Sequence, residues 1–254
     1  MNTTKIYMHG LEINIRVETG YQDVNVISEC LGGDCYQLRE LSKRKSPKVV
    51  LDIGGHIGAF GMMAKQIWPD CELIAVEPCK VSYELYCQNL KDNGFTGTVL
   101  NKAIGYNPKR TKLMPASRTT GGGVVLSDDE IKDYSDSMYR MYSDETEDVE
   151  IITVDELIKD YSVIDLAKMD CEGGEVDALR EMEFETAAKF RAVVGEYHLW
   201  GDGKRILGAS PLDEMAFWRD VIKKFPHLLW SWTEKASVEN KYGKFQAWPK
   251  CQTK

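Results

Sequence analysis

Short apolar runs alternate with amphipathic stretches over most of this chain. In the first half, three apolar runs are too short for a helix and are bounded by turn residues, as is typical of central parallel strands. These runs lie at 48–53, 73–77 and 97–104. Between them, apolar residues recur at helical spacing over 54–68 and 81–90. Strands and helices in this order predict parallel pairing with right-handed crossovers, and therefore a doubly wound sheet.

The same alternation returns in the second half. It predicts strands at 149–153, 163–169 and 191–198, with helices at 155–158, from Glu175 onward and from Ser210 onward. Two further runs, 228–233 and 243–248, are expected to close the sheet as an antiparallel pair. The predicted fold is thus α/β, a mostly parallel sheet of about seven strands with an antiparallel final strand.

Two segments depart from this pattern. Residues 11, 13, 15 and 17 are apolar and alternate with polar neighbours, so residues 1–47 are predicted to form a β-rich N-terminal extension packed on a core domain of residues 48–254. The segment at about 114–148 contains Gly121–Gly123, and ten acidic residues stand against two basic ones between 127 and 150. We expect a lid over the acceptor site here, with a solvated acidic loop as the alternative.

Charge and cysteine content exclude several classes of protein. The net charge is −8, and the acidic segment accounts for it, so no basic surface for nucleic acid or lipid remains. The N-terminus lacks the features of a signal peptide and no run of 18 apolar residues occurs, which predicts a cytoplasmic protein without membrane insertion. The seven cysteines form no C-x-x-C pair, so free thiols are expected rather than a zinc or redox site.

A glycine-rich turn, Asp52-Ile-Gly-Gly-His-Ile-Gly58, follows the first parallel strand. Ligands of open α/β sheets bind at this edge. The dinucleotide fingerprint fails, because the third and sixth positions counted from Gly54 hold His56 and Ala59. A carboxylate from Asp52 would repel a pyrophosphate but would suit the ammonium and sulfonium groups of S-adenosylmethionine. A nicotinamide oxidoreductase is therefore disfavoured.

An acidic residue, Glu77, ends the next strand, where it can accept both hydroxyl hydrogens of a ribose. Taken alone, Glu77 fits a solvated turn or a helix cap better than a ligand, but Asp52, the glycine turn and Glu77 together favour an adenosyl ligand. Asn101 or Ala103 on the third strand would then border the adenine. The residues predicted to bind cofactor are Asp52, Gly54, Gly55, His56, Gly58, Glu77, Pro78, Asn101, Ala103 and Asp170.

Three blocks of the sequence resemble the FkbM family of class I methyltransferases, which have a Rossmann-like fold. They are Val50-Leu-Asp-Ile-Gly-Gly-His-Ile-Gly58, then Ile74-Ala-Val-Glu-Pro78 with Asn89-Leu90, and Thr153-Val-Asp-Glu-Leu157 leading to Lys168-Met-Asp-Cys-Glu-Gly-Gly-Glu175. The resemblance implies methyl transfer from S-adenosylmethionine, usually to an oxygen of a natural product, sugar or lipid and in some members to nitrogen. His56 and Gly174 depart from the residues usual there, Asn and Ala.

The acceptor side is predicted at the ends of the strands at 163–169 and 191–198. Residues two apart on a strand share a face, so Asp170 projects with Lys168, as does Glu172 if the strand extends that far, and Glu196 projects with His198. His198 is the expected base because its unperturbed pKa lies near neutrality, with Asp170 and Glu196 orienting it or the acceptor.

Two other interpretations of these residues stay open. His198 could be an ordinary strand-end histidine while Glu196 pairs with Lys168. Asp170, Glu196 and His198 could instead hold a divalent cation such as magnesium, although spacing alone assigns no metal ligand. Tryptophans 200, 218, 230, 232 and 248 could line an acceptor pocket, but most should lie in the core.

The expected function is methylation of a hydroxyl oxygen on a small molecule, sugar or natural product. N-methylation of a small molecule or peptide and a non-catalytic adenosyl-binding module are the alternatives. A nucleic-acid methyltransferase would need basic surface and a Pro-aromatic run after 163–169, and the sequence has neither. The identity of the acceptor and the oligomeric state are not predicted, because acceptor pockets are built from variable loops.

Overall fold

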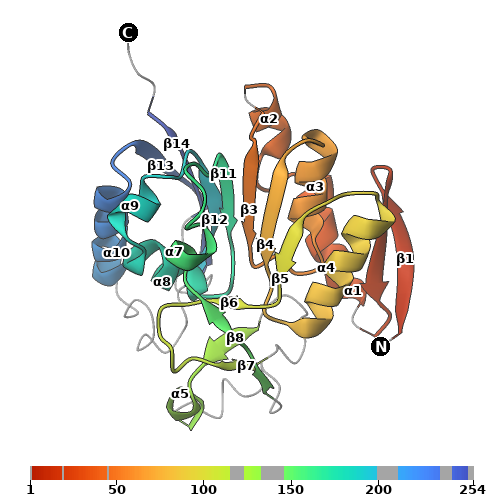
Figure 1. Cartoon of the computed structure of the whole chain (residues 1–254), viewed down its shortest axis with the longest axis horizontal. Helices are drawn as coiled ribbons and strands as arrows, with labels where there is room; N and C mark the ends of the chain where they lie inside the picture. Colours follow the sequence, from red (N-terminus) through yellow and green to blue (C-terminus); the bar gives the residue numbers. More distant parts are fainter. Residues whose placement is uncertain are drawn as a thin grey trace.

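The fold, taken from a computed structural model, is described for residues 2–18, 20–44, 46–114, 123–132, 146–198, 211–234 and 242–250. Its centre is a seven-stranded sheet with the strand order β13-β14-β12-β11-β3-β4-β5 (Figure 1). In that order the strands are Leu228–Glu234, Tyr242–Pro249, Val193–His198, Leu166–Met169, Val49–Ile53, Glu72–Val76 and Thr98–Leu100. β14 pairs antiparallel with both neighbours and the other pairs are parallel, which confirms the predicted doubly wound, mostly parallel sheet.

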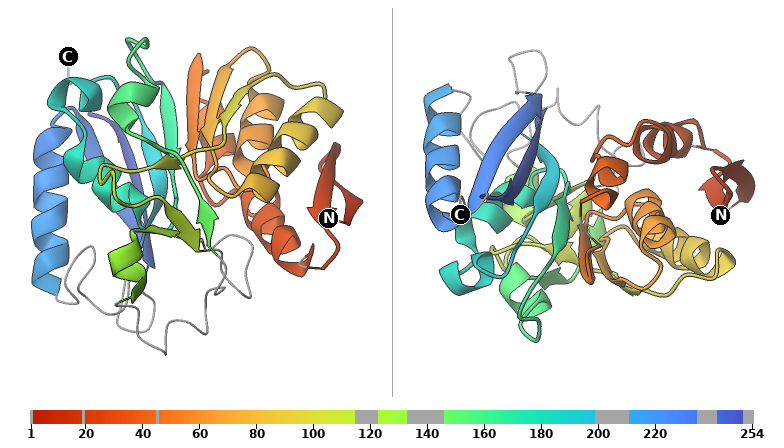
Figure 2. Two further views of the ribbon diagram at one scale, coloured as in Figure 1. Left: turned by 60° about the horizontal axis from the view of Figure 1, so that its bottom comes forward. Right: turned by 90° about the horizontal axis from the view of Figure 1, so that it is seen from above.

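Helices cover both faces of the sheet (Figures 1 and 2). The sheet separates two large apolar clusters, one on each face. One face carries α3 (Ala59–Ile67), α4 (Lys80–Asp92) and the N-terminal elements. The other carries α7 (Val154–Leu157), α8 (Gly174–Glu181), α9 (Phe184–Ala187) and α10 (Pro211–Lys224). This layering leaves the carboxyl edge of the parallel strands as the place where loops from both faces meet. None of the helices within the described ranges combines the length and the apolar character needed to cross a membrane.

The N-terminal segment is β-structured only in its first part. β1 (Thr3–Met8) and β2 (Leu11–Arg16) form an antiparallel hairpin, and Leu11, Ile13 and Ile15 are buried as the alternation predicts. The prediction of a β-rich segment is wrong beyond it. Three short helices follow, α1 (Gly20–Ile27), η1 (Ser28–Gly32) and α2 (Leu38–Ser42), because the buried positions 23, 27, 30 and 31 recur at helical rather than alternating spacing.

The predicted strand at 97–104 is two strands in different sheets. β5 ends at Leu100, and β6 (Ala103–Ile104) pairs in parallel with β10 (Ile151–Ile152). The break lies at Asn101, whose side-chain amide donates hydrogen bonds of 2.9 and 2.8 Å to the carbonyls of Glu77 and Pro78. This side chain therefore ties the end of the third parallel strand to the end of the second.

Parts of the acidic insertion have regular structure. A small antiparallel sheet is formed by β7 (Lys112–Met114), β8 (Val124–Leu126) and β9 (Glu147–Asp148). The helix α5 (Asp128–Lys132) directly follows β8 in the chain. Arg110 joins the insertion to α8, because it pairs with Glu130 at 2.9 Å and with Asp177 at 2.6 Å. Residues 115–122 and 133–145 lie outside the described residues, so the lid remains a prediction.

Candidate active site

The turn after β3 requires glycine because the protein itself approaches it closely. Gly54 has a φ of +76°, and a Cβ there would lie 1.9 Å from the carbonyl oxygen of Asp170. Gly58 has a φ of +93°, and a Cβ there would lie 2.2 Å from the ring of Tyr86. We expected these glycines to admit a ligand. The structure adds a second reason for them, which is close packing against the end of β11 and against α4.

Gly54→Ala is expected to unfold at a lower urea concentration than Gly94→Ala. Gly94 also has a left-handed φ, +69°, but a Cβ there would have no neighbour within 4 Å, so it serves as a matched control. Both variants incur the left-handed cost of about 1–2 kcal/mol. Only Gly54→Ala adds the overpacking cost of about 1–3 kcal/mol. Equal destabilisation of the two variants, measured by equilibrium denaturation, would show that the contact with Asp170 relaxes freely.

Glu77 lies just beyond β4 with its carboxylate against the glycine turn. It accepts hydrogen bonds from the backbone N–H of His56 at 2.7 Å and of Cys79 at 2.9 Å, one on each oxygen. Burial raises the pKa of Glu77 to about 7, although these two hydrogen bonds act to lower it. Each carboxylate oxygen retains a second lone pair, so the two oxygens can accept hydrogen bonds from the two hydroxyls of a ribose.

The other residues predicted around the adenosyl group are distributed differently. Beside Glu77, the side-chain amide of Asn101 donates a hydrogen bond to the carbonyl of Pro78. Ala103 lies in β6, outside the main sheet, and is buried in a small cluster with Leu113 and Val149.

Asp52 lies behind the glycine turn and is fully buried. It accepts a hydrogen bond of 2.8 Å from the hydroxyl of Tyr86 and lies 3.5 Å from the ammonium of Lys168. Burial raises the pKa of Asp52, while Lys168 and Tyr86 oppose that rise. Because this carboxylate is balanced inside the protein, the expected attraction between Asp52 and a bound ammonium does not follow from this geometry.

Lys168, paired with Asp52, also holds the glycine turn in place through hydrogen bonds. Its ammonium donates hydrogen bonds to the carbonyls of Ile53, Gly54 and Asp170, which belong to the ends of β3 and β11. Burial acts to lower the pKa of Lys168, but Asp52 and Asp170 raise it overall, so the side chain is charged. The alternative interpretation, in which Lys168 pairs with Glu196, is wrong, since Glu196 pairs with Lys244 at 3.2 Å.

Asp170, just beyond β11, is brought together with Glu196 and His198, which lie in the last three residues of β12. One potential ligand atom from each lies within 4.8 Å of the others. Burial acts to raise the pKa of Asp170, but Lys168 and His198 lower it overall, so this carboxylate is ionised. Burial raises the pKa of Glu196 to about 7, with Asp170 acting in the same direction.

His198 is held by carboxylates on both sides of its ring. Nδ1 lies 3.0 Å from Glu175, while Nε2 lies 3.6 Å from Glu172 and 3.8 Å from Glu196. Burial acts to lower the pKa of His198, but Glu172 and Glu175 raise it well above its usual value. The sequence argument for His198 as a base assumed an unperturbed pKa. In this setting the imidazole is protonated near neutral pH.

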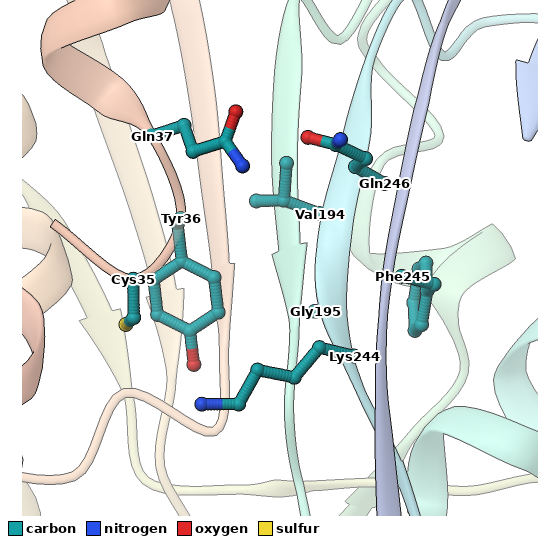
Figure 3. A pocket seen from close by; sticks show the side chains of 8 residues that line it. All are labelled: Cys35, Tyr36, Gln37, Val194, Gly195, Lys244, Phe245 and Gln246. Carbon is teal, nitrogen blue, oxygen red and sulfur yellow. The ribbon is translucent and has the colours of Figure 1, made fainter. Parts of the chain in front are cut away.

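Sequence reasoning missed two residues that contact this cluster, Tyr36 and Lys244. The hydroxyl of Tyr36 donates a 2.7 Å hydrogen bond to Asp170, and Lys244 pairs with Glu196. Both side chains border a small pocket between residues 35–37 and strands β12 and β14, where their polar ends face each other (Figure 3). Antiparallel pairing of β14 with β12 sets Lys244 opposite Glu196 and could have indicated that pair. No local pattern in the sequence places Tyr36 at Asp170.

The same cluster has features of a cation site. Asp170, Glu196 and His198 offer two carboxylates and an imidazole, and the contact of His198 Nδ1 with Glu175 orients Nε2 toward Glu172 and Glu196. A carboxylate on the remote ring nitrogen is a common arrangement for metal-binding histidines. These three residues could hold a divalent cation, which would displace the proton from Nε2 of His198.

Most of the tryptophans lie in the core or pack against it, and the described cysteines are free thiols, as expected. Trp218 and Trp230 are buried in the core cluster beneath β12 and β14, and Trp232 and Trp248 pack against the two clusters. Trp200 lies outside the described residues. The six cysteines within the described ranges are free thiols.

The sheet order, the glycine turn and the acidic residue after β4 together define a class I methyltransferase fold. Residues 52–230 match the sequence model of the methyltransferase FkbM domain, and the chain belongs to that family. It is 26% identical over 202 residues to the methyltransferase sdnD of Sordaria araneosa, covering 67% of this chain and 73% of that protein. A SAM-dependent methyltransferase from Agrobacterium tumefaciens has the same fold, with a TM-score of 0.52 at 13% identity, covering 97% of this chain and 70% of the other. The protein is thus a methyltransferase.

Proposed function

We propose that the protein transfers a methyl group from S-adenosylmethionine to a hydroxyl oxygen of a small molecule, sugar or natural product bound beyond β11 and β12. The observation that carries this proposal is the convergence of Asp170, Glu196 and His198 within 4.8 Å at the carboxyl edge of the sheet. A hydroxyl acceptor must be aligned with the methyl group and must lose a proton, and this cluster supplies groups for both tasks.

Each residue then has a distinct task. Glu77 binds the ribose hydroxyls, and bound S-adenosylmethionine supplies an electrophilic methyl group on its sulfonium. Asp170, ionised and held by Tyr36, accepts a hydrogen bond from the acceptor and orients it. Glu196 takes the acceptor's proton, because its pKa of about 7 leaves much of it ionised at neutral pH. His198 carries a positive charge beside Glu196 and stabilises its ionised form.

These tasks predict that kcat/KM for the acceptor, measured with S-adenosylmethionine saturating at every pH, rises as the pH passes through about 7. Below that pH Glu196 is protonated and cannot accept a proton, whereas above it the carboxylate is ionised. Removing the charge in His198→Gln should move the rise to higher pH, because His198 lowers the pKa of Glu196. Glu196→Gln should abolish the rise. If kcat/KM kept its wild-type dependence on pH in both variants, Glu196 would not have this role.

The experiment that tests the function is an acceptor screen. The protein is incubated with S-adenosylmethionine and a panel of hydroxylated and aminated small molecules, short peptides and RNA oligonucleotides. Release of S-adenosylhomocysteine and the gain of one methyl group are then measured by mass spectrometry. The proposal expects methylated alcohols. Products methylated only at nitrogen or only on RNA would overturn the acceptor class, and the absence of any product would favour an adenosyl-binding module.

The cation site is the second candidate that the geometry favours, and it has a separate test. If Asp170, Glu196 and His198 bind magnesium, treatment with EDTA removes turnover and added magnesium restores it, while affinity for S-adenosylhomocysteine is unchanged. If they act directly on the acceptor, EDTA has no effect.

A further inference from the structure

A buried ion pair from the N-terminal segment lies beneath the cofactor turn. Arg16, the last residue of β2, donates a 2.9 Å hydrogen bond from Nη1 to Asp23 of α1, and its backbone N–H donates another of 2.9 Å to the same carboxylate. The guanidinium also donates a hydrogen bond to the hydroxyl of Ser82, near the start of α4. Asp23 is fully buried and Arg16 nearly so. Both precede the region that matches the FkbM domain.

This pair contacts the glycine turn through the ring of His56. Nε2 of His56 lies 3.3 Å from Nη1 of Arg16 and 3.4 Å from Oδ1 of Asp23. The backbone N–H of the same histidine donates the 2.7 Å hydrogen bond to Glu77. A continuous set of polar contacts therefore runs from the N-terminal hairpin through His56 to the carboxylate expected to bind ribose.

Two physical arguments indicate that the pair fixes geometry. A buried ion pair loses its hydration, and replacing one by apolar residues often leaves stability unchanged or higher, so stability alone does not account for it. His56 also has a φ of +49°, in the left-handed region that non-glycine residues adopt only when their surroundings hold them there. Arg16 and Asp23 are charged side chains that contact its ring.

We propose that Arg16 and Asp23 are positioning residues, which fix His56 and through its backbone N–H orient Glu77 toward the ribose of the cofactor. This inference rests on the assignment of Glu77 to the ribose in the proposed function. It extends the cofactor site to a part of the chain that precedes the family domain.

The test compares how the protein discriminates adenosine from 2′-deoxyadenosine. Each nucleoside competes with S-adenosylhomocysteine in isothermal titration calorimetry, and wild type should prefer adenosine by about tenfold or more, as expected for a hydroxyl bonded to a carboxylate. In Asp23→Asn the preference should fall toward unity. Because that variant leaves Arg16 with a weakened partner, the double variant Arg16→Met with Asp23→Leu is also measured; it removes both charges and is expected to preserve the fold. Arg110→Met, which breaks a pair in the insertion, is the control and should retain the wild-type preference.

The outcomes separate the two claims. Loss of the preference in folded Asp23→Asn and in the double variant, with the preference intact in Arg110→Met, supports the positioning role. A wild-type preference in both folded variants would overturn it while leaving Glu77 as the ribose ligand. Equal binding of the two nucleosides by wild type would overturn the Glu77 assignment and this inference with it.

Discussion

Replacing His198 by alanine is expected to lower turnover at pH 7 by about tenfold for each unit by which the pKa of Glu196 rises, while leaving affinity for S-adenosylmethionine nearly unchanged. The ring lies between Glu175 on one side and Glu172 and Glu196 on the other, so its loss leaves three neighbouring carboxylates without their shared positive charge. The pKa of Glu196 would then rise, so at pH 7 a smaller fraction of Glu196 could take the proton of the acceptor. The measurement is single-turnover formation of S-adenosylhomocysteine, with calorimetry for binding.

His227→Ala is the matched control for that variant. His227 is hydrogen-bonded to the carbonyl of Phe190, away from the cluster, and its loss should leave turnover close to wild type. If His198→Ala retained wild-type turnover in the same assay, the imidazole would have no part in the reaction. A matching loss in affinity for S-adenosylmethionine would place His198 in the cofactor site instead.

Glu77→Gln is expected to weaken binding of S-adenosylmethionine by about 1–3 kcal/mol, the usual effect of removing a charged hydrogen-bond partner. Binding by wild type should also weaken as the pH falls below about 7, because the pKa of Glu77 in the free protein is about 7 and the protonated carboxyl is a poorer acceptor for ribose hydroxyls. Calorimetry between pH 6 and 8 measures both effects, with the pH range set by about one unit on either side of that value.

Glu72→Gln provides the control, since Glu72 begins the strand that precedes Glu77 and lies at the opposite edge of the sheet, where it accepts a hydrogen bond from Tyr161. Its affinity should match wild type at every pH. Unchanged affinity and pH dependence in Glu77→Gln would remove Glu77 from the cofactor site.

The central strands could be predicted because each is an apolar run that is too short to form a helix. The runs at 48–53 and 163–169 became β3 and β11, and the final antiparallel pair became β13 and β14. The glycine turn and Glu77 were found for the same local reason, since each directly follows such a strand. Periodicity failed in the N-terminal segment, where the hairpin pattern was extended over residues that form helices.

The electrostatics of the site could not be predicted, because they depend on contacts between distant parts of the chain. Asp52 is balanced by Lys168, 116 positions further along, and Asp170 is bonded by Tyr36, 134 positions earlier. The high pKa of His198 likewise requires Glu172 and Glu175 to fold back against the ring. Spacing along a strand indicates which residues share a face, but not which charges from other elements face them.

The central claim is that cofactor and acceptor meet at the carboxyl edge of β3, β4, β11 and β12. A crystal structure with S-adenosylhomocysteine bound tests it most directly. The account predicts both ribose hydroxyls within hydrogen-bonding distance of Glu77, and the sulfur directed toward the space bounded by Asp170, Glu196 and His198. A ribose bonded elsewhere, or a sulfur directed away from these three side chains, would contradict it.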